Sequence, residues 1–206
     1  MKLDPEGRTL HGLTTFATFV VLNLLYLITC LPVLTIGAAT SSLYEVGLRY
    51  ADHERGNPLR DYLVGLVRNA RRGTAVLLAL GVPMLVLLFA ARFWYSFGSA
   101  FSLLGMLAAL LAALYLGGAL LHGFALVAAF DAGIRTTVRN ALLLPGAEPL
   151  RTAGLVLLPL TAALMALVIP STLVLIGTIG CSFGAYLSAL LLRPVYRRLS
   201  AEYAAG

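Results

Sequence analysis

The stretch that decides the fold is Phe93–Phe130, which reads FWYSFGSAFSLLGMLAALLAALYLGGALLHGFALVAAF and contains no charged residue. A helix needs about 20 mostly apolar residues to cross the hydrocarbon layer of a bilayer. The run therefore predicts a membrane-spanning helix over 102–129. The whole chain agrees, because 60% of its 206 residues are hydrophobic and only 12% are charged. Soluble domains are about 25% charged, so water is excluded as the main solvent.

Three further charge-free stretches, Thr9–Tyr44, Gly73–Ala91 and Thr152–Leu192, hold the other predicted spans. By length and hydropathy these spans lie near 12–31, 74–91, 153–169 and 172–192. We therefore predict an all-α fold, a polytopic membrane helix bundle with five long spans. Residues 1–206 are expected to form a single integral membrane domain.

Residues Pro32–Gly37 interrupt the first apolar region. Pro32 lacks a backbone donor, and Gly37 tolerates unusual backbone dihedral angles. We predict a break here, followed by a short returning half-helix over 38–50 whose small residues permit close packing. Such a break at membrane depth is expected to be shielded by protein or by a wet cavity. The alternative is that 38–50 forms part of a cytoplasmic segment.

Basic residues gather in 49–73, 131–152 and 193–206, which the positive-inside rule places in the cytoplasm. The C-terminus is therefore predicted to be cytoplasmic. Five simple spans would put the N-terminus outside, whereas the returning half-helix also brings Lys2 and Arg8 inside. Arg92 is then the one basic residue outside, so we favour a cytoplasmic N-terminus.

Asn57-Pro58 predicts a helix start, because asparagine caps free backbone N–H groups and proline fits the first turn. The apolar face of this helix is predicted from its spacing to consist of Leu59, Tyr62, Leu63, Leu66, Val67 and Ala70. We expect an amphipathic interfacial helix over 58–72 at the cytoplasmic membrane surface, ended by Gly73. A weaker amphipathic segment starts at Ile134 and stops at Pro145-Gly146. The candidate lipid-docking or partner-docking residues of both segments are Arg60, Arg68, Arg71, Arg72, Arg135 and Arg139.

Three short motifs follow one another near the N-terminus: Asn23-Leu-Leu-Tyr26, Leu31-Pro-Val-Leu-Thr-Ile-Gly37 and Leu43-Tyr44. In order and spacing they resemble the N-terminal signature of the bacterial YesL family, number 624 among domains of unknown function. The resemblance extends over Phe130-Asp131, Arg139-Asn-Ala-Leu-Leu143, Ser182-Phe-Gly-Ala-Tyr186 and Leu192-Arg-Pro-Val-Tyr196. It implies a multipass protein of the bacterial plasma membrane, encoded near sugar-uptake ABC transporters and polysaccharide-degrading enzymes, with no assigned catalytic residues.

Polar residues inside or beside the apolar stretches carry two interpretations. The candidate ligand-binding residues are Asn23, Tyr26, Thr35, Gly37, Tyr44, Glu45 and His122. Several of them flank the broken first helix, and in transporters the freed backbone groups of broken helices bind ions or substrates. The alternative is packing, because Asn, Thr and His bond across membrane helices. Glu45 at the membrane surface would simply be solvated.

Catalytic and metal-binding patterns are missing from the predicted spans. A hydrolase at membrane depth would need a Ser/His pair, paired acids or a metal-ligand set, so we expect no enzyme, no metal and no cofactor. Cys30 and Cys181 lack ligand spacing and are expected to pack as small apolar residues. The net charge of +6 is assigned to topology, and no nucleic-acid partner is expected.

Three functional hypotheses remain. The first is an accessory or regulatory component of a carbohydrate ABC transporter, docked through the basic helices. The second is a small transporter or permease subunit with its site at the broken first helix. The third, a membrane enzyme, has the least support. The expected partners are the lipid bilayer and a sugar ABC transporter, with a homo-oligomer left open.

Overall fold

The computed structural model describes residues 5–52 and 56–205, with side chains from 13–52 and 56–198, and these residues are helical with no strand. Three basic residues of the topology argument lie outside the described parts: Lys2, Arg55 and, for its side chain, Arg8. The order of elements is α1 (Pro5–Thr29), a 3-10 turn η1 (Val33–Thr35), α2 (Ile36–Ala51), α3 (Pro58–Val76), a π-helical segment η2 (Leu77–Gly81), α4 (Val82–Tyr95), α5 (Ala100–Ala129), α6 (Ile134–Ala147), α7 (Pro149–Val168), α8 (Thr172–Leu175), a second π-helical segment η3 (Ile176–Gly180) and α9 (Cys181–Ala205).

Four helices within the described ranges are long and apolar enough to cross a membrane: Pro58–Tyr95, Ala100–Ala129, Pro149–Val168 and Thr172–Arg198. Leu13–Thr29 is a fifth, shorter apolar helix. The predicted all-helical, membrane-embedded class is therefore confirmed. The predicted count of five long spans is not, because the first segment is shorter than the others.

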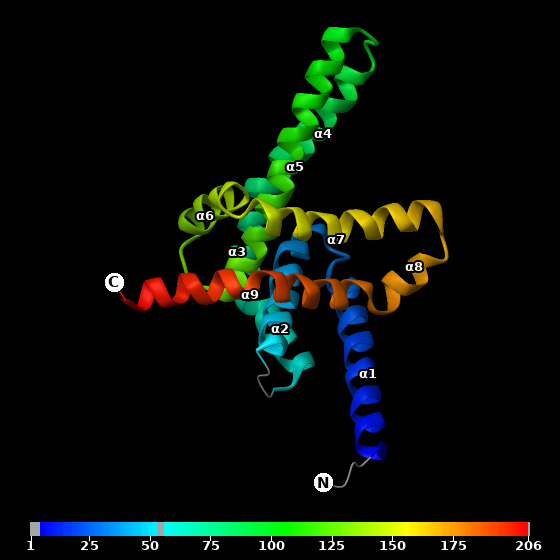
Figure 1. The fold of residues 1–206 in the computed structure, drawn as a ribbon, viewed down its shortest axis with the longest axis vertical. Coiled ribbons are helices and arrows are strands. Elements are labelled where there is room, and N and C mark those ends of the chain that lie inside the picture. The colour runs from blue at the N-terminus through cyan, green and yellow to red at the C-terminus, as the bar shows by residue number, and fades with distance from the viewer. Residues whose placement is uncertain (1–4, 53–55, 206) are drawn as a thin grey trace.

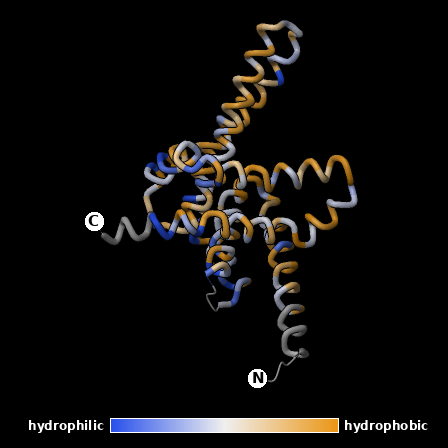
Figure 2. Tube along the Cα trace, viewed as in Figure 1, coloured by the Kyte–Doolittle hydropathy of each residue, from blue (hydrophilic) through white to orange (hydrophobic). Residues whose placement is uncertain are grey.

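Two arms, the α4–α5 hairpin and the α7–α8 segment, extend from the centre of the molecule (Figure 1). The α4–α5 hairpin projects away from the rest of the chain, whereas α7 and α9 run across its direction. Hydrophilic residues gather around α2, α3, α6 and the later part of α9, and the arms are mostly hydrophobic (Figure 2).

The break after α1 lies where the sequence predicts it. Helix α1 ends at Thr29 and α2 begins at Ile36, close to the predicted returning half-helix. The side chains of Leu31 and Val33 in the break are exposed, so the rest of the described chain does not cover them. Neighbouring hydroxyls satisfy freed carbonyl groups instead: Thr35 Oγ1 donates to Thr29 O, and Thr74 Oγ1 donates to Leu34 O at 2.9 Å.

Helix α3 differs from the predicted interfacial helix in its end and its buried face. Asn57 does cap its start, accepting from the backbone of Leu59 and Arg60, but the helix passes through Gly73 and continues into α4. Its buried face consists of Tyr62, Gly65, Asn69, Gly73 and Val76. The predicted apolar face is only partly buried: Tyr62 is buried and Leu59 and Leu66 are half-buried, but Leu63, Val67 and Ala70 are exposed.

The physical reason is that membrane helices pack through small residues, because lipid solvates leucine and valine as well as protein does. A Cβ built on Gly73 would lie 2.8 Å from Ala38 N, so only glycine permits this approach of α3 to α2. Gly73 is therefore a packing residue and not a helix stop. Helix α6 likewise includes Pro145 and ends at Ala147, beyond the predicted stop at Pro145-Gly146.

Candidate functional site

The predicted ligand-binding residues do not form one site. The structure distributes them over a buried asparagine contact, the α1–α2 break, an apolar cavity, an α5–α7 contact and a charged cavity. The charged cavity contains only Glu45 from that set.

Asn23 is fully buried and makes four hydrogen bonds to the backbone around η3. Its amide nitrogen donates to the carbonyl oxygens of Ile176 (3.1 Å) and Gly177 (2.7 Å). Its amide oxygen accepts from the N–H groups of Cys181 (2.8 Å) and Ser182 (3.0 Å). A π-helical segment leaves backbone groups without regular helical partners, and Asn23 satisfies them, which leaves it no donor or acceptor position for a ligand.

Tyr26 and Tyr44 line an apolar cavity of about 560 Å³ between α2, α7 and α9. The Tyr26 hydroxyl lies 3.2 Å from Thr40 Oγ1. Thr35 bonds within the break, and Gly37 packs against Gly73. The polar site predicted at the broken helix is therefore an apolar groove beside an internally bonded turn.

His122 is fully buried on α5, and its Nε2 lies 2.8 Å from Thr152 Oγ1 on α7. Thr152 Oγ1 also donates to Glu148 O at 3.0 Å. This arrangement agrees with the packing interpretation of His122, in which the imidazole bonds a neighbouring helix. His122 Nδ1 is buried and has no partner.

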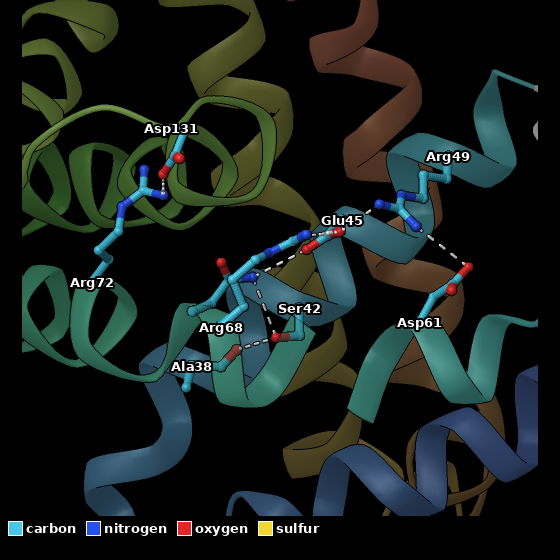
Figure 3. Close-up of polar contacts among 9 residues, drawn as sticks. Ala38, Ser42, Glu45, Arg49, Asp61, Arg68, Arg72 and Asp131 are labelled. Atoms are coloured by element: carbon cyan, nitrogen blue, oxygen red, sulfur yellow. Dashed lines mark hydrogen bonds and ion pairs between the residues drawn. The ribbon is translucent and has the colours of Figure 1, made fainter. Parts of the chain in front are cut away.

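Glu45 is 5% exposed and is the centre of a charged network between α2 and α3. Its Oε1 accepts from Arg68 and lies 3.1 Å from an Arg49 nitrogen, while its Oε2 accepts from Asn69 at 3.2 Å (Figure 3). Gly65 makes room for it, because a Cβ there would lie 3.1 Å from Oε2. The interpretation of Glu45 as a solvated surface residue is therefore wrong.

A second charged group lies two helical turns further on. Asp52, directly after α2, accepts through Oδ1 from Arg193 Nε (2.6 Å) and Arg197 Nη2 (2.9 Å) on α9. Residues seven positions apart share a helix face, so Glu45 and Asp52 point to the same side of α2. Sequence reasoning missed Asp52, Arg193 and Arg197 as a site, and this spacing of two acids was the available signal.

These two groups line one cavity of about 450 Å³, here called the arginine cavity. Its charged lining residues are Glu45, Arg49, Asp52, Arg68, Arg193 and Arg197. Leu48, Ala128, Phe130 and Tyr196 form its apolar part. Each carboxylate is shared by two guanidinium groups, so positive charge is in excess.

The remaining predicted docking residues fall into two sets. Arg60 and Arg71 on α3 and Arg135 and Arg139 on α6 are exposed, and we call these four the basic face. Arg72 instead joins α3 to the connection between α5 and α6, since its Nη1 donates to Asp131 at 2.8 Å and its Nη2 donates to Phe130 O. Arg72 is thus an internal link rather than a docking residue.

In a scan of protein families, residues 19–91 match the family described as "Protein of unknown function, DUF624". The match confirms the resemblance carried by the N-terminal motifs. The motifs after Phe130 lie outside the matched segment. No curated protein and no solved structure matches the chain. The matched segment includes Glu45, Arg49, Asp52 and Arg68 of the arginine cavity.

Proposed function

Because the chain carries the DUF624 family segment at residues 19–91, we propose that it is an accessory component of a carbohydrate ABC transporter in the bacterial plasma membrane. In this proposal it is not an enzyme, and it docks its partner through the basic face. The association with sugar uptake rests on what the family resemblance implies. The observation that carries the docking role is the pairing of α3 and α6.

Helices α3 and α6 are far apart in sequence yet contact each other. Arg72 on α3 also bonds Asp131 and Phe130, in the connection that leads from α5 into α6. Arg71 directly precedes Arg72, so it lies on the part of α3 that is linked to the α5–α6 connection, whereas Arg60 lies in the first turn of α3. Both helices lie in a chain with helices that are long and apolar enough to cross a membrane. Arginine presents a planar fork of donors that suits carboxylates and phosphates. Such a surface fits acidic side chains of a partner subunit or anionic lipid headgroups.

The topology proposed for this role places the basic face in the cytoplasm. The supporting pattern is the positive-inside distribution of arginine, with both termini on the cytoplasmic side. An ABC transporter holds its ATPase subunits on that side, so the face would meet the permease–ATPase junction. Anionic headgroups of the inner leaflet would contribute about 1 kcal/mol for each nearby basic residue.

The geometry favours this role over the alternatives. A transporter centred on the broken helix would need a polar cavity there, whereas the cavity next to Tyr26 and Tyr44 is apolar. An acid–base enzyme would need a carboxyl group free to exchange protons. Glu45 is instead held by Arg49, Arg68 and Asn69.

The test is site-specific crosslinking in native membranes after induction by a carbohydrate. Single cysteines replace Arg60, Arg71 and Arg139 in turn, on a background in which Cys30 and Cys181 are replaced. Arg68 is avoided because its loss would break the pair with Glu45. The matched control is a cysteine at Leu167, an exposed apolar position on α7.

We expect a permease or ATPase subunit of a sugar importer to be crosslinked from the basic face and not from Leu167. Recovery of only lipid and copies of this chain from all positions would refute the accessory role. Equal recovery of the transporter from Leu167 would refute the assignment of the docking surface.

A further inference from the structure

The arginine cavity holds more positive charge than its own carboxylates balance. Four guanidinium groups and two carboxylates line it. Asp61 lies 3.5 Å from Arg49 and reduces the excess, but its side chain is not part of the lining. The side chains of Arg49, Arg68, Arg193 and Arg197 are 27–65% exposed and each pairs with a carboxylate. Among the described lining residues, however, two carboxylates serve four guanidinium groups, so the net positive charge favours an anion in the cavity.

The donors in the cavity are only partly used by internal bonds. Arg193 donates to Asp52 through Nε, and Arg197 donates to Asp52 through Nη2. Both bonds end on the same oxygen, Oδ1. Each guanidinium has five N–H groups in a rigid fork. Most donors of Arg193 and Arg197 therefore remain for a ligand, while Asp52 fixes the direction of both forks.

The shape and chemistry of the cavity select one class of anion. Guanidinium groups approach from α2, α3 and α9 toward a common space of about 450 Å³. A phosphate group carries several acceptor oxygens in a tetrahedral arrangement, so it accepts from donors on different sides, and arginine binds it by paired hydrogen bonds. A metal cation would be repelled by the net positive charge of the lining residues. The rings of Phe130 and Tyr196 pack edge to face, with their centroids 5.5 Å apart. Each ring therefore already contacts another aromatic ring.

We propose that the arginine cavity is a binding site for a phosphate-bearing anion, held by Arg68, Arg193 and Arg197. Glu45 and Asp52 orient the guanidinium groups. Leu48 and Ala128 form an apolar wall on which the carbon part of the ligand rests. The phosphate belongs either to an anionic phospholipid headgroup or to a small soluble phosphate compound. This site is distinct from the basic face, and its occupancy does not depend on an ABC transporter.

The first measurement is the binding of inorganic phosphate to the full chain in neutral detergent, by isothermal titration calorimetry at constant ionic strength. The cavity variant is Arg193→Gln with Arg197→Gln. The matched control, called the surface control, is Arg92→Gln with Arg198→Gln, which removes the same charge from two exposed arginines outside both the cavity lining and the basic face. We expect the dissociation constant to rise about tenfold or more in the cavity variant and less than about twofold in the control, because charge-assisted hydrogen bonds are lost only in the former.

A third variant guards against misfolding. Arg193→Lys with Arg197→Lys keeps the charge and a bond to Asp52 but removes the planar forks, so it is expected to fold and to bind phosphate more weakly than the native chain. Equal losses in the cavity variant and the surface control, or native-like binding in the lysine variant, would overturn the site. So would tighter binding of a poly-glutamate peptide than of phosphate, which would make the cavity a peptide site.

A second measurement separates the two sources of phosphate. Native mass spectrometry counts phosphatidylglycerol retained after extraction from vesicles of phosphatidylcholine and phosphatidylglycerol. Retention by the native chain and the surface control, with loss in the cavity variant, supports the proposal with a lipid headgroup as ligand. Equal retention by all three together with phosphate binding that depends on Arg193 and Arg197 supports it with a soluble ligand. No phosphate binding and no selective lipid retention would contradict it.

Discussion

The backbones of Gly37 and Gly73 lie directly against each other, at the point where α2 packs on α3. A Cβ on Gly37 would overlap the Gly73 carbonyl group, and a Cβ on Gly73 would lie 2.6 Å from Gly37 C. This contact joins the returning half-helix to the long α3–α4 helix. It lies within the DUF624 segment at 19–91.

We expect Gly37→Ala to lower the free energy of unfolding by about 1–3 kcal/mol, because the added methyl group forces two packed backbones apart. The matched control is Gly184→Ala on α9, where a Cβ would meet nothing within 4 Å. Unfolding in mixed micelles, followed by circular dichroism, measures both. Equal stability of the two variants would contradict the close α2–α3 contact.

We expect Asn23→Leu to lower the free energy of unfolding by about 2–3 kcal/mol, because buried backbone groups around η3 lose their partners. Hydrogen exchange at Cys181 and Ser182, whose N–H groups bond Asn23, should accelerate. Asn140→Leu on the exposed side of α6 is the control and should leave both quantities unchanged. Unaltered exchange at 181–182 in Asn23→Leu would argue against the contact.

Glu45→Gln should have two effects of opposite sign. Stability should fall by about 1–2 kcal/mol, because Arg49 and Arg68 lose their shared carboxylate and both are partly solvated. The affinity of the arginine cavity for inorganic phosphate should rise, up to about tenfold, because one negative charge is removed from it. Calorimetric titration and micelle unfolding measure the two effects.

Asp61→Asn serves as the comparison for Glu45→Gln, since Asp61 pairs with Arg49 from outside the cavity lining. A smaller gain in phosphate affinity is expected there. Weaker phosphate binding by Glu45→Gln would mean that Glu45 is needed to hold the guanidinium groups in place more than it opposes the anion.

His122 and Thr152 should be energetically coupled across the α5–α7 contact. A double-mutant cycle of His122→Ala and Thr152→Val should give a coupling energy of about 0.5–1.5 kcal/mol, the range for hydrogen bonds between membrane helices. Thr161, which bonds only within α7, replaces Thr152 in the control cycle. Zero coupling with Thr152 would show that the bond contributes nothing to stability.

Local patterns predicted the elements of the fold well. The charge-free run around 102–129 predicted α5, and the proline–glycine pair at 32–37 predicted the break before α2. Asn57-Pro58 predicted the start of α3. These predictions succeed because helix starts, breaks and spanning length depend on residues next to one another in the chain.

The candidate site was predictable only in part. Glu45 and Arg68 were identified separately, one as a ligand residue and one as a docking residue, but not as a pair. The positive-inside rule already explained Arg193 and Arg197 as arginines at the cytoplasmic end of a span. That rule says nothing about which side chain an arginine bonds. The buried face of α3 was mispredicted, because amphipathicity assumes water on the polar side and protein on the apolar side. In a membrane, lipid takes the apolar side and small residues face protein.

By itself the sequence determined that this chain is helical and embedded in a membrane, since hydropathy and charge act on each segment independently of the others. The tertiary structure alone decided that Asp52 meets Arg193 and Arg197 across 141 and 145 positions of sequence. It also decided that Asn23 forms its hydrogen bonds with the backbone around η3 and not with a ligand. Such contacts depend on how whole helices pack, and the composition of a single helix does not specify which neighbour its polar groups will meet.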